Sequence, residues 1–539
     1  MPVQPTYPGV YIEEVPSGIR PITGVATSVT CFIGSAVKGG LNTAISVTTF
    51  ADYQRIFGGL SADHAMSYAV YQFFLNGGVQ AYVVRVINTT NADTSSLSFP
   101  DGVATVMVLD AASPGAWGSN LRGRVDHNTR PLLAGEAADS LFNLRVVDIA
   151  SDQLEVHRNV SIDDAQPNFV GTVLAERSSL VRLDPASTLA TRPEITPAPD
   201  GGATEFEDSP DGAASSNAIE ATQGADGDDL TGAEISGSAG PPKTGLHAFD
   251  AVEVVSLLCV PPFTVNATSG STLDGDITAA VRTSALSYAR GRMAMFIVDP
   301  LNSWTSHTDV LGANGVDSAT FGLARDANAV LYFPHVRQLD PLRGGSLVTL
   351  SPSGMLAGVM ARTDSQRGVW KSPAGIEATL IGASDLTVRL TDPENGQLNQ
   401  QGVNCLRVFR GVGRVSWGAR TLRGADLLAD QWKYLAVRRM ALFLEQSLYR
   451  GLQWVVFEPN DEPLWANIRL NVGAFMTTLF RQGAFQGATP REAFFVKCDG
   501  ETTTQADIDN GIVNIEVGFA PLKPAEFVII KLSQKTAES

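Results

Sequence analysis

The sequence predicts a multidomain protein of the mixed α/β class. Apolar runs of strand length alternate with helical stripes through most of its 539 residues. This length is typical of two to four domains, and a hydrophobic share of 44% is enough for sizeable cores. A polar, acidic stretch at residues 190–240 interrupts the alternation. We therefore expect an α/β body that carries an insertion.

The first 22 residues are expected to form an extended arm. Prolines break this segment, and the residues between Pro8 and Pro16 alternate like a single strand with no hairpin partner nearby. A lone strand must pair somewhere, because its backbone groups would otherwise lose hydrogen bonds. Pairing with a distant strand of the same chain and pairing with a neighbouring molecule both remain open. The residues of this strand include Val10, Tyr11, Ile12 and Val15.

Strand and helix patterns then alternate up to about residue 400. Apolar runs typical of strands occupy residues 29–36, 81–87, 103–109, 144–149, 293–300 and 329–336. Helical patterns occupy residues 65–75 and 277–290, and another helix is expected from Pro352, with Ser351 as a candidate cap.

Two polar or Gly-rich segments break this alternation. Between residues 191 and 235 there are eleven acids and one Arg, and no apolar periodicity survives. We expect a solvated loop or a disordered insertion there. A second segment, at residues 399–422, is predicted to be a Gly-rich connector into the C-terminal part.

The C-terminal part is predicted to be a compact α/β unit in which two helices flank a strand at residues 452–457. The second helix begins after Asp461, which can cap its free amides, and Pro463 fits its first turn. The apolar stripes of the two helices are Tyr434, Val437, Ala441, Leu444 and Leu448, and then Trp465, Ile468, Val472, Phe475 and Leu479. Further strands are expected at residues 493–499, 512–519 and 526–532.

The charge of the chain is uneven. Its formal net charge is −17, which argues against nucleic acid as the main partner, because phosphate binding needs clustered Lys and Arg. Residues 401–539 hold 16 Lys and Arg against 14 Asp and Glu, so the remaining 400 residues carry −19. This asymmetry indicates two surfaces with different neighbours.

Four scattered cysteines, each among apolar residues, are expected to be buried thiols in a reducing compartment. The N-terminus lacks the pattern of a signal peptide, and no apolar run reaches 18 residues. We therefore expect synthesis in the cytoplasm and no membrane insertion.

Motifs for catalysis are not evident. No two of the six histidines have metal-ligand spacing, and His335 is expected to be structural. The acidic cluster around Asp226 lacks the spaced ligands of a calcium loop. Gly411 and Gly413 do not form a dinucleotide fingerprint. These observations favour a protein that is not an enzyme and needs no cofactor.

The chain resembles the tail sheath proteins of contractile phage tails and of related bacterial contractile injection systems, nearest to the extracellular injection particles. The resemblance covers most of the chain outside about residues 125–235. It rests on YPGVYIEEVPSGIRPI from Tyr7, FDAVEVVSLLCVP from Phe249, YFPHVRQLDP from Tyr332, SGMLAGVMARTDSQRGVWKSPAG from Ser353, LNQQGVNCLRVFRGVGRVSWGARTL from Leu398, and YLAVRRMALFLEQSLYRGLQWVVFEPNDEPLWANIRLNVGAFMTTLFRQGAFQG from Tyr434.

The resemblance implies a division of the chain into inner and outer domains. This division is an N-terminal arm at 1–22, an outer α/β domain in two parts at 23–124 and 249–400, a surface insertion at 125–248, an inner domain at 401–524, and a C-terminal strand arm at 525–539.

The resemblance also implies a structural polymer of six-fold rings around an inner tube, with baseplate and tail-terminator proteins as further partners. Both arms would add strands to sheets of neighbouring subunits, and contraction would drive the tube through a target envelope. The C-terminal residues implied in this exchange are Phe527, Val528, Ile529, Ile530 and Leu532. Candidate contacts to the tube or to other subunits are Arg438, Arg439, Arg469 and Arg481. The alternatives are another tail component, such as tube or baseplate, and a hydrolase with a site in residues 25–400.

Overall fold

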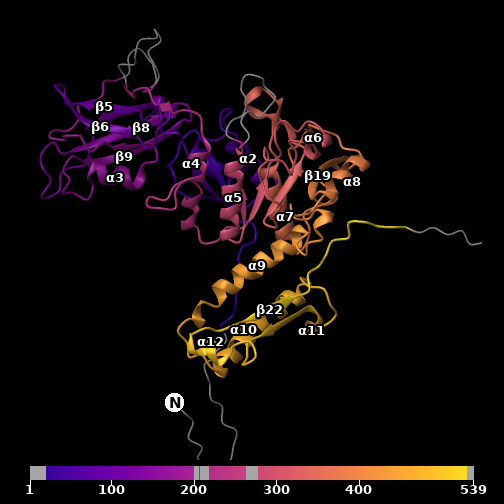
Figure 1. Cartoon of the computed structure of the whole chain (residues 1–539). Helices are drawn as coiled ribbons and strands as arrows, with labels where there is room; N and C mark the ends of the chain where they lie inside the picture. The colour runs from indigo at the N-terminus through magenta and orange to yellow at the C-terminus, as the bar shows by residue number, and fades with distance from the viewer. Residues whose placement is uncertain (1–19, 199–204, 207–217, 263–276, 531–539) are drawn as a thin grey trace, which may run out of the picture.

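The computed structural model describes residues 20–198, 205–206, 218–262 and 277–530, and Figure 1 shows three units in them. A β-rich unit in indigo and magenta adjoins a central α/β body. Below this body, helix α9 (Leu435–Gly451) connects to a smaller C-terminal unit drawn in yellow. The expected strand at residues 10–15 and Leu532 of the C-terminal arm lie outside the described residues. The mixed α/β class is confirmed.

The central body is built on one extended sheet, which is parallel from β3 to β19 and has antiparallel strands at both edges. Its strands, in spatial order, are β2 (Ile45–Val47), β3 (Ala81–Arg85), β1 (Thr30–Gly34), β13 (Leu257–Cys259), β14 (Met295–Val298), β15 (Ala329–Phe333), β19 (Val403–Phe409) and β20 (Gly413–Ser416). The continuous apolar runs of the sequence fit this position, because strands of a parallel sheet are covered on both faces.

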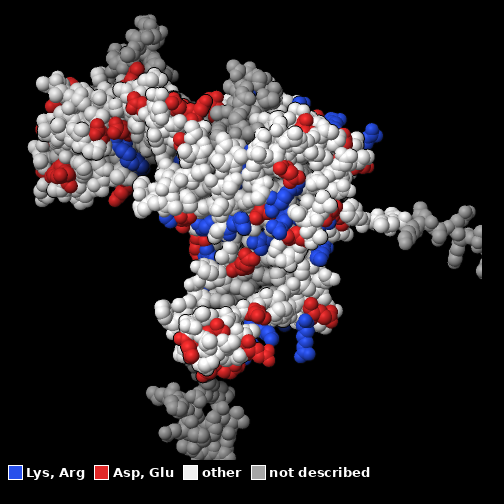
Figure 2. Space-filling view, in the orientation of Figure 1, with Lys and Arg blue, Asp and Glu red and all other residues white. Residues whose placement is uncertain are grey.

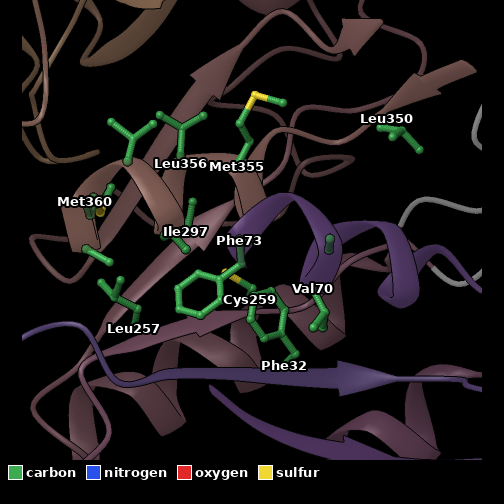
Figure 3. Packing of buried hydrophobic residues seen from close by; sticks show 14 of the residues in the cluster. Phe32, Val70, Phe73, Leu257, Cys259, Ile297, Leu350, Met355, Leu356 and Met360 are labelled. Atoms are coloured by element: carbon green, nitrogen blue, oxygen red, sulfur yellow. The ribbon is translucent and has the colours of Figure 1, made fainter. Parts of the chain in front are cut away.

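Helices cover both faces of this sheet. One face carries α1 (Phe50–Phe57), α2 (Ala65–Leu75) and α7 (Ser353–Arg367), whose side chains share a core with the strands. Figure 3 shows this core, in which the rings of Phe32 and Phe73 meet edge to face with centroids 5.6 Å apart. The other face carries α4 (Gly232–Ser236), the 3₁₀ helix η2 (Gly245–Ala251), α5 (Ala279–Gly291), α6 (His307–Leu311) and α8 (Asp392–Gln400).

Glycine allows α2 and α7 to pack with backbone contact. A Cβ atom on Gly354 would lie 2.2 Å from the carbonyl oxygen of Ala69, and one on Gly358 would lie 2.5 Å from that of Phe73. Next to this helix pair, a smaller sheet contains β17 (Ser346–Leu350), β16 (Val336–Asp340) and β18 (Asp385–Leu386), with η3 (Pro341–Arg343) in the turn.

The β-rich unit is a pair of sheets around a shared apolar core. One sheet contains β10 (Val181–Leu183), β6 (Thr105–Ala111) and β5 (Ser96–Pro100), and the other contains β11 (Ile219–Glu220), β7 (Leu121–Asp126), β8 (Leu141–Asp148) and β9 (Gln153–Ser161). The unit also contains β4 (Ala92–Asp93), η1 (Ala116–Asn120), α3 (Val170–Arg177) and β12 (Ala225–Asp226). The boundary that the sequence suggested at residue 125 falls inside β7.

Buried charges attach this unit to the central body. The Lys38 ammonium lies 3.2 Å from the carboxylate of Asp148, with both side chains buried. The buried guanidinium of Arg85 donates to the carbonyl oxygens of Ala36 and Gly39 beside the central sheet, and to that of Pro114 in the β-rich unit.

The C-terminal unit packs around α10 (Glu462–Arg481). Its other elements are η5 (Gln453–Val455), α11 (Pro490–Ala493), β21 (Phe494–Lys497), α12 (Gln505–Asp509) and β22 (Glu516–Phe519), and η4 (Asp426–Leu428) precedes α9. As predicted, Asp461 caps α10, Pro463 lies in its first turn, and the five stripe residues of α10 are buried. The four cysteines are free and buried, as expected.

Four sequence-based expectations are wrong. Residues 452–457 do not form a buried strand but a short 3₁₀ turn, and Phe457 is fully exposed with a positive φ of 70°. Ser351 does not cap α7, because the carboxylate of Asp299 accepts from the amide and hydroxyl of Ser353 instead.

The other two corrections concern segments judged to be irregular. The Gly-rich connector at 399–422 contains the β19–β20 hairpin, with Gly411 and Gly413 at its turn, so the domain boundary expected at residue 401 falls inside the central sheet. Part of the acidic segment is ordered as well: β11, β12 and α4 lie within it, and Ile235 is completely buried.

Candidate assembly interface

The C-terminal residues leave the body as an extended apolar segment. After β22, residues 522–530 form no strand with the described part of the chain. Phe527, Val528, Ile529 and Ile530 are consecutive and between 73% and 82% exposed. Figure 1 shows this segment, in yellow, departing from the body. Four adjacent exposed apolar residues are unfavourable in water, so this geometry favours burial against another surface.

The N-terminal segment lies along α9. The amide of Arg20 donates to Asn471 Oδ1 on α10, and the Arg20 guanidinium lies 4.9 Å from the ring centroid of Trp454. Further along, the amide of Val25 donates to Ser447 Oγ on α9. Arg20, the first described residue, therefore lies near the C-terminal end of α9.

The two chain ends leave from opposite ends of α9. The Glu526 side chain accepts from the hydroxyl of Tyr434, which immediately precedes the helix, whereas Arg20 lies beside Trp454, which follows it. With 17 residues and a rise of about 1.5 Å per residue, α9 separates the two points by about 26 Å. Because α9 is a regular helix, it keeps the distance between the attachment points of Glu526 and Arg20 fixed.

Strands β21 and β22 form a small antiparallel sheet at the surface of the C-terminal unit. Within the described residues each of these strands pairs with the other alone, so each leaves an outer edge open. Phe495 of β21 is exposed beside this edge. An open edge can accept an added strand through main-chain hydrogen bonds.

The four candidate arginines differ in their surroundings. Arg439 is buried and paired with Asp364, and Arg438 donates to Asn328 Oδ1 and Glu445 while stacking on Trp432. Arg469 pairs with Glu462 at 2.5 Å.

Arg481 differs from these three. It is exposed and makes no ion pair with the residues that the structure describes. Figure 2 shows Lys and Arg, mixed with acids, gathered where the central body faces α9. Only Arg481 of the four therefore has its charge available for another molecule.

Burial shifts the pKa values of several titratable side chains. His335 is buried, and burial lowers its pKa from 6.5 to about 4, so the ring is neutral at pH 7. Burial raises the pKa of the Cys405 thiol to about 12. In the described ranges no group of three or more His, Cys, Asp or Glu side chains could hold a metal ion. None of the helices described is long and apolar enough to span a membrane.

Comparison with known protein families identifies two domains that together cover most of the C-terminal half. Residues 274–422 match the model of the phage tail sheath protein central domain, and residues 429–535 match that of the phage tail sheath C-terminal domain. These residues therefore carry the central and C-terminal domains of phage tail sheath proteins. The two matches meet between the central sheet and α9, so the interface described above lies mainly in the C-terminal domain.

Curated sheath relatives align with part of the chain. A tail sheath protein of Vibrio phage KVP40 is 27% identical over 179 residues, which are 33% of this chain and 25% of the relative. A putative prophage major tail sheath protein of Pseudomonas aeruginosa strain UCBPP-PA14 is 26% identical over 223 residues, 40% of this chain and 54% of the relative. The alignments thus span about a quarter and about half of these relatives.

Solved sheath structures share the fold over almost the whole chain. The sheath complex of PVC, an extracellular contractile injection system, in the contracted state gives a TM-score of 0.56 at 20% identity, covering 99% of both chains. The helical sheath of the anti-feeding prophage in the contracted state gives 0.55 at 22% identity, covering 99% of this chain and 100% of the other. A sheath tail protein from Listeria innocua gives 0.58 at 14% identity, covering 93% and 96%.

Proposed function

We propose that the chain is the structural subunit of a contractile tail sheath. It polymerises around an inner tube in stacked six-fold rings, and contraction of the polymer drives the tube through a target envelope. The observation that carries this proposal is the apolar C-terminal arm, exposed and unpaired in a chain whose C-terminal domain is that of a tail sheath protein. The sheath fold shared over 99% of the chain supports the same function.

The arms link neighbouring subunits by strand addition. Residues 527–532 of one copy, together with residues 10–15 of another, add to the open edges of the β21–β22 sheet. Each main-chain hydrogen bond contributes roughly 1 kcal/mol net. Burial of Phe527, Val528, Ile529 and Ile530, now exposed, adds a hydrophobic contribution.

These links are compatible with large movements of the subunits. The bodies rotate and repack between an extended lattice and a shorter, wider lattice, and the extended arms keep the copies connected. The free energy for contraction is stored in the first lattice and released by a trigger at the baseplate. This cycle requires no cofactor, catalytic residue or nucleic acid.

The proposal includes a set of partners. The inner tube contacts the inner face of the polymer, and baseplate and terminator proteins bind at its two ends. The free charge of Arg481 and the excess of Lys and Arg over Asp and Glu after residue 400 support the C-terminal domain as the side that faces the tube. Assembly takes place in the cytoplasm of the producing bacterium, and the polymer becomes part of a phage tail or injection particle.

Negative-stain electron microscopy of the purified chain tests this function, with and without co-expressed tube protein. Striated hollow tubes are the expected product in at least one of the two conditions. Monomers alone across a range of salt and protein concentrations, even with the tube protein present, would rule the sheath function out.

A further inference from the structure

Within the described residues, the side chain of Glu526 holds the C-terminal arm to the body before the arm departs. Ala525 and Phe527 are exposed, but the side chain of Glu526 between them is only 16% exposed. Its two carboxylate oxygens accept from Nε and Nη2 of Arg420, both at 2.7 Å. We infer that Arg420 and Glu526 form a latch that fixes the point and direction from which the arm reaches a neighbouring copy.

The Arg420 side of the latch is preorganised. Its side chain is 1% exposed, and Nη1 donates to the carbonyl oxygen of Asn399 at 2.7 Å and to Asp426 Oδ1 at 3.0 Å. The guanidinium is therefore held in place, with one complete edge presented to the arm. A bidentate pair of this kind fixes orientation as well as position, because both N–H groups and both oxygens must align.

The latch closes a strap across a groove. The strap is residues 521–526, which begin on the C-terminal unit, where Pro521 bridges to Phe485 and the amide of Gln486 donates to the carbonyl oxygen of Ala520. They end at the central body, where Glu526 meets Arg420. The groove beneath has a volume of about 890 Å³, and its lining includes Trp370 and Trp417.

This geometry has a mechanical consequence. A pull on residues 527–530 reaches both the C-terminal unit, through the start of the strap, and the central body, through Arg420. Without the latch, the same pull would act on the C-terminal unit alone. Tyr434, which donates to Glu526 at 3.4 Å, also brings the N-terminal end of α9 into the anchored group. The latch thus rests on the proposed function for its purpose, but its existence can be tested in the monomer.

Glu526→Gln removes the charge that holds the arm while keeping the size of the side chain. The matched control is Glu458→Gln, an exposed residue whose side chain forms no hydrogen bond with the described residues. A spin label at Ala525→Cys, on the full chain, reports the motion of the strap. We expect Glu526→Gln to shift the label to faster motion and Glu458→Gln to leave it unchanged, with both variants still unfolding cooperatively. The critical concentration for polymerisation of Glu526→Gln should rise roughly tenfold, because a loosened arm must be ordered when it joins a neighbouring copy.

Two results would overturn the inference. A label that is as mobile before the Glu526→Gln change as after it would show that the strap is not latched. Polymerisation of Glu526→Gln at the parental concentration, with a loosened strap, would show that the latch does not present the arm. If the parental chain forms no polymer even with tube protein, the proposed function fails, and label mobility decides the latch independently.

Discussion

Arg439 and Asp364 form a bidentate ion pair where α9 meets the central body. Arg439 Nη1 lies 2.8 Å from Asp364 Oδ1 and Nη2 lies 2.6 Å from Oδ2, with side chains only 3% and 5% exposed. The hydroxyl of Thr27 donates to the same carboxylate. This cluster joins α7, α9 and the N-terminal segment, so it stabilises the attachment of α9 to the central body.

Substitution of Asp364 should weaken this connection strongly. Asp364→Ala leaves the buried guanidinium of Arg439 without its counter-ion, which typically costs about 3–5 kcal/mol. The control is Glu377→Ala, which removes an exposed partner of Arg367 on the same helix and should cost less than about 1 kcal/mol. Urea unfolding followed by circular dichroism measures both. Equal losses in the two variants would contradict a structural role for the buried pair.

The glycine contact between α2 and α7 predicts a second difference. Gly354→Ala places a methyl group against the Ala69 carbonyl, so the helices must separate, at a cost of about 1–3 kcal/mol or more. Gly473→Ala in α10 meets no atom within 4 Å and should stabilise the protein by about 0.5–1 kcal/mol. Thermal unfolding of the two variants should shift in opposite directions, and a stabilised Gly354→Ala would refute the close packing.

Burial of His335 predicts a pH dependence of stability. Its folded-state pKa of about 4 lies below the unfolded value of 6.5, so the unfolded chain takes up the proton first as the pH falls. The neutral ring therefore contributes fully to the free energy of unfolding above pH 6.5. This contribution is lost progressively between pH 6.5 and 4, and the total loss is about 3 kcal/mol. The free energy of unfolding should therefore fall less between pH 7.5 and pH 4.5 in His335→Leu than in the parental chain. A variant with the parental pH slope would show that His335 does not titrate in this way.

The C-terminal arm should matter for the polymer and not for the monomer. Ile529→Asp replaces a side chain that is 82% exposed, so the melting temperature of the monomer should change little. A carboxylate in an intermolecular apolar contact is costly, so polymerisation should fail. Val103→Asp is the control, because Val103 is 96% exposed on the β-rich unit, away from the arm. Sedimentation of both variants distinguishes them, and normal polymers of Ile529→Asp would exclude the arm from assembly.

Arg481 should be important at the tube. Arg481→Glu reverses an unpaired exposed charge, so monomer stability should stay within about 0.5 kcal/mol of the parental value. Co-assembly with tube protein should weaken, and the effect should diminish at high salt because exposed charges are screened. Arg491→Glu, also exposed, is the control. If both reversals impair co-assembly equally, the effect is one of net charge and not of a contact at Arg481.

Local pattern predicted the regular elements well. Residues 65–75 form a helix with the expected bounds, and α10 has its predicted cap and buried stripe, because each signal lies within about 20 neighbouring residues. The prediction for the run at 452–457 was wrong, since its last two apolar side chains, Val456 and Phe457, face solvent. An apolar pattern cannot distinguish a side chain that faces its own core from one at the surface.

Long-range pairing accounts for the remaining differences. Arg439 and Asp364 are 75 residues apart, and Arg420 and Glu526 are 106 apart, so only the fold shows that these charges are neutralised within the chain. One local signal was available for Arg439: Ala436 and Leu442, three residues away on either side, belong to the same buried face of α9. Because the apolar face of α9 is wide enough to include position 439, it indicates that the Arg439 side chain is buried.

Helical reconstruction of the assembled polymer by cryo-electron microscopy tests the central claim most directly. The account predicts that residues 527–530 of each copy lie as an added strand on the β21–β22 sheet of a neighbouring copy, while Glu526 stays on Arg420 of its own chain. A polymer in which these residues fold back onto their own body, or in which the β21–β22 edges remain unoccupied, would contradict it.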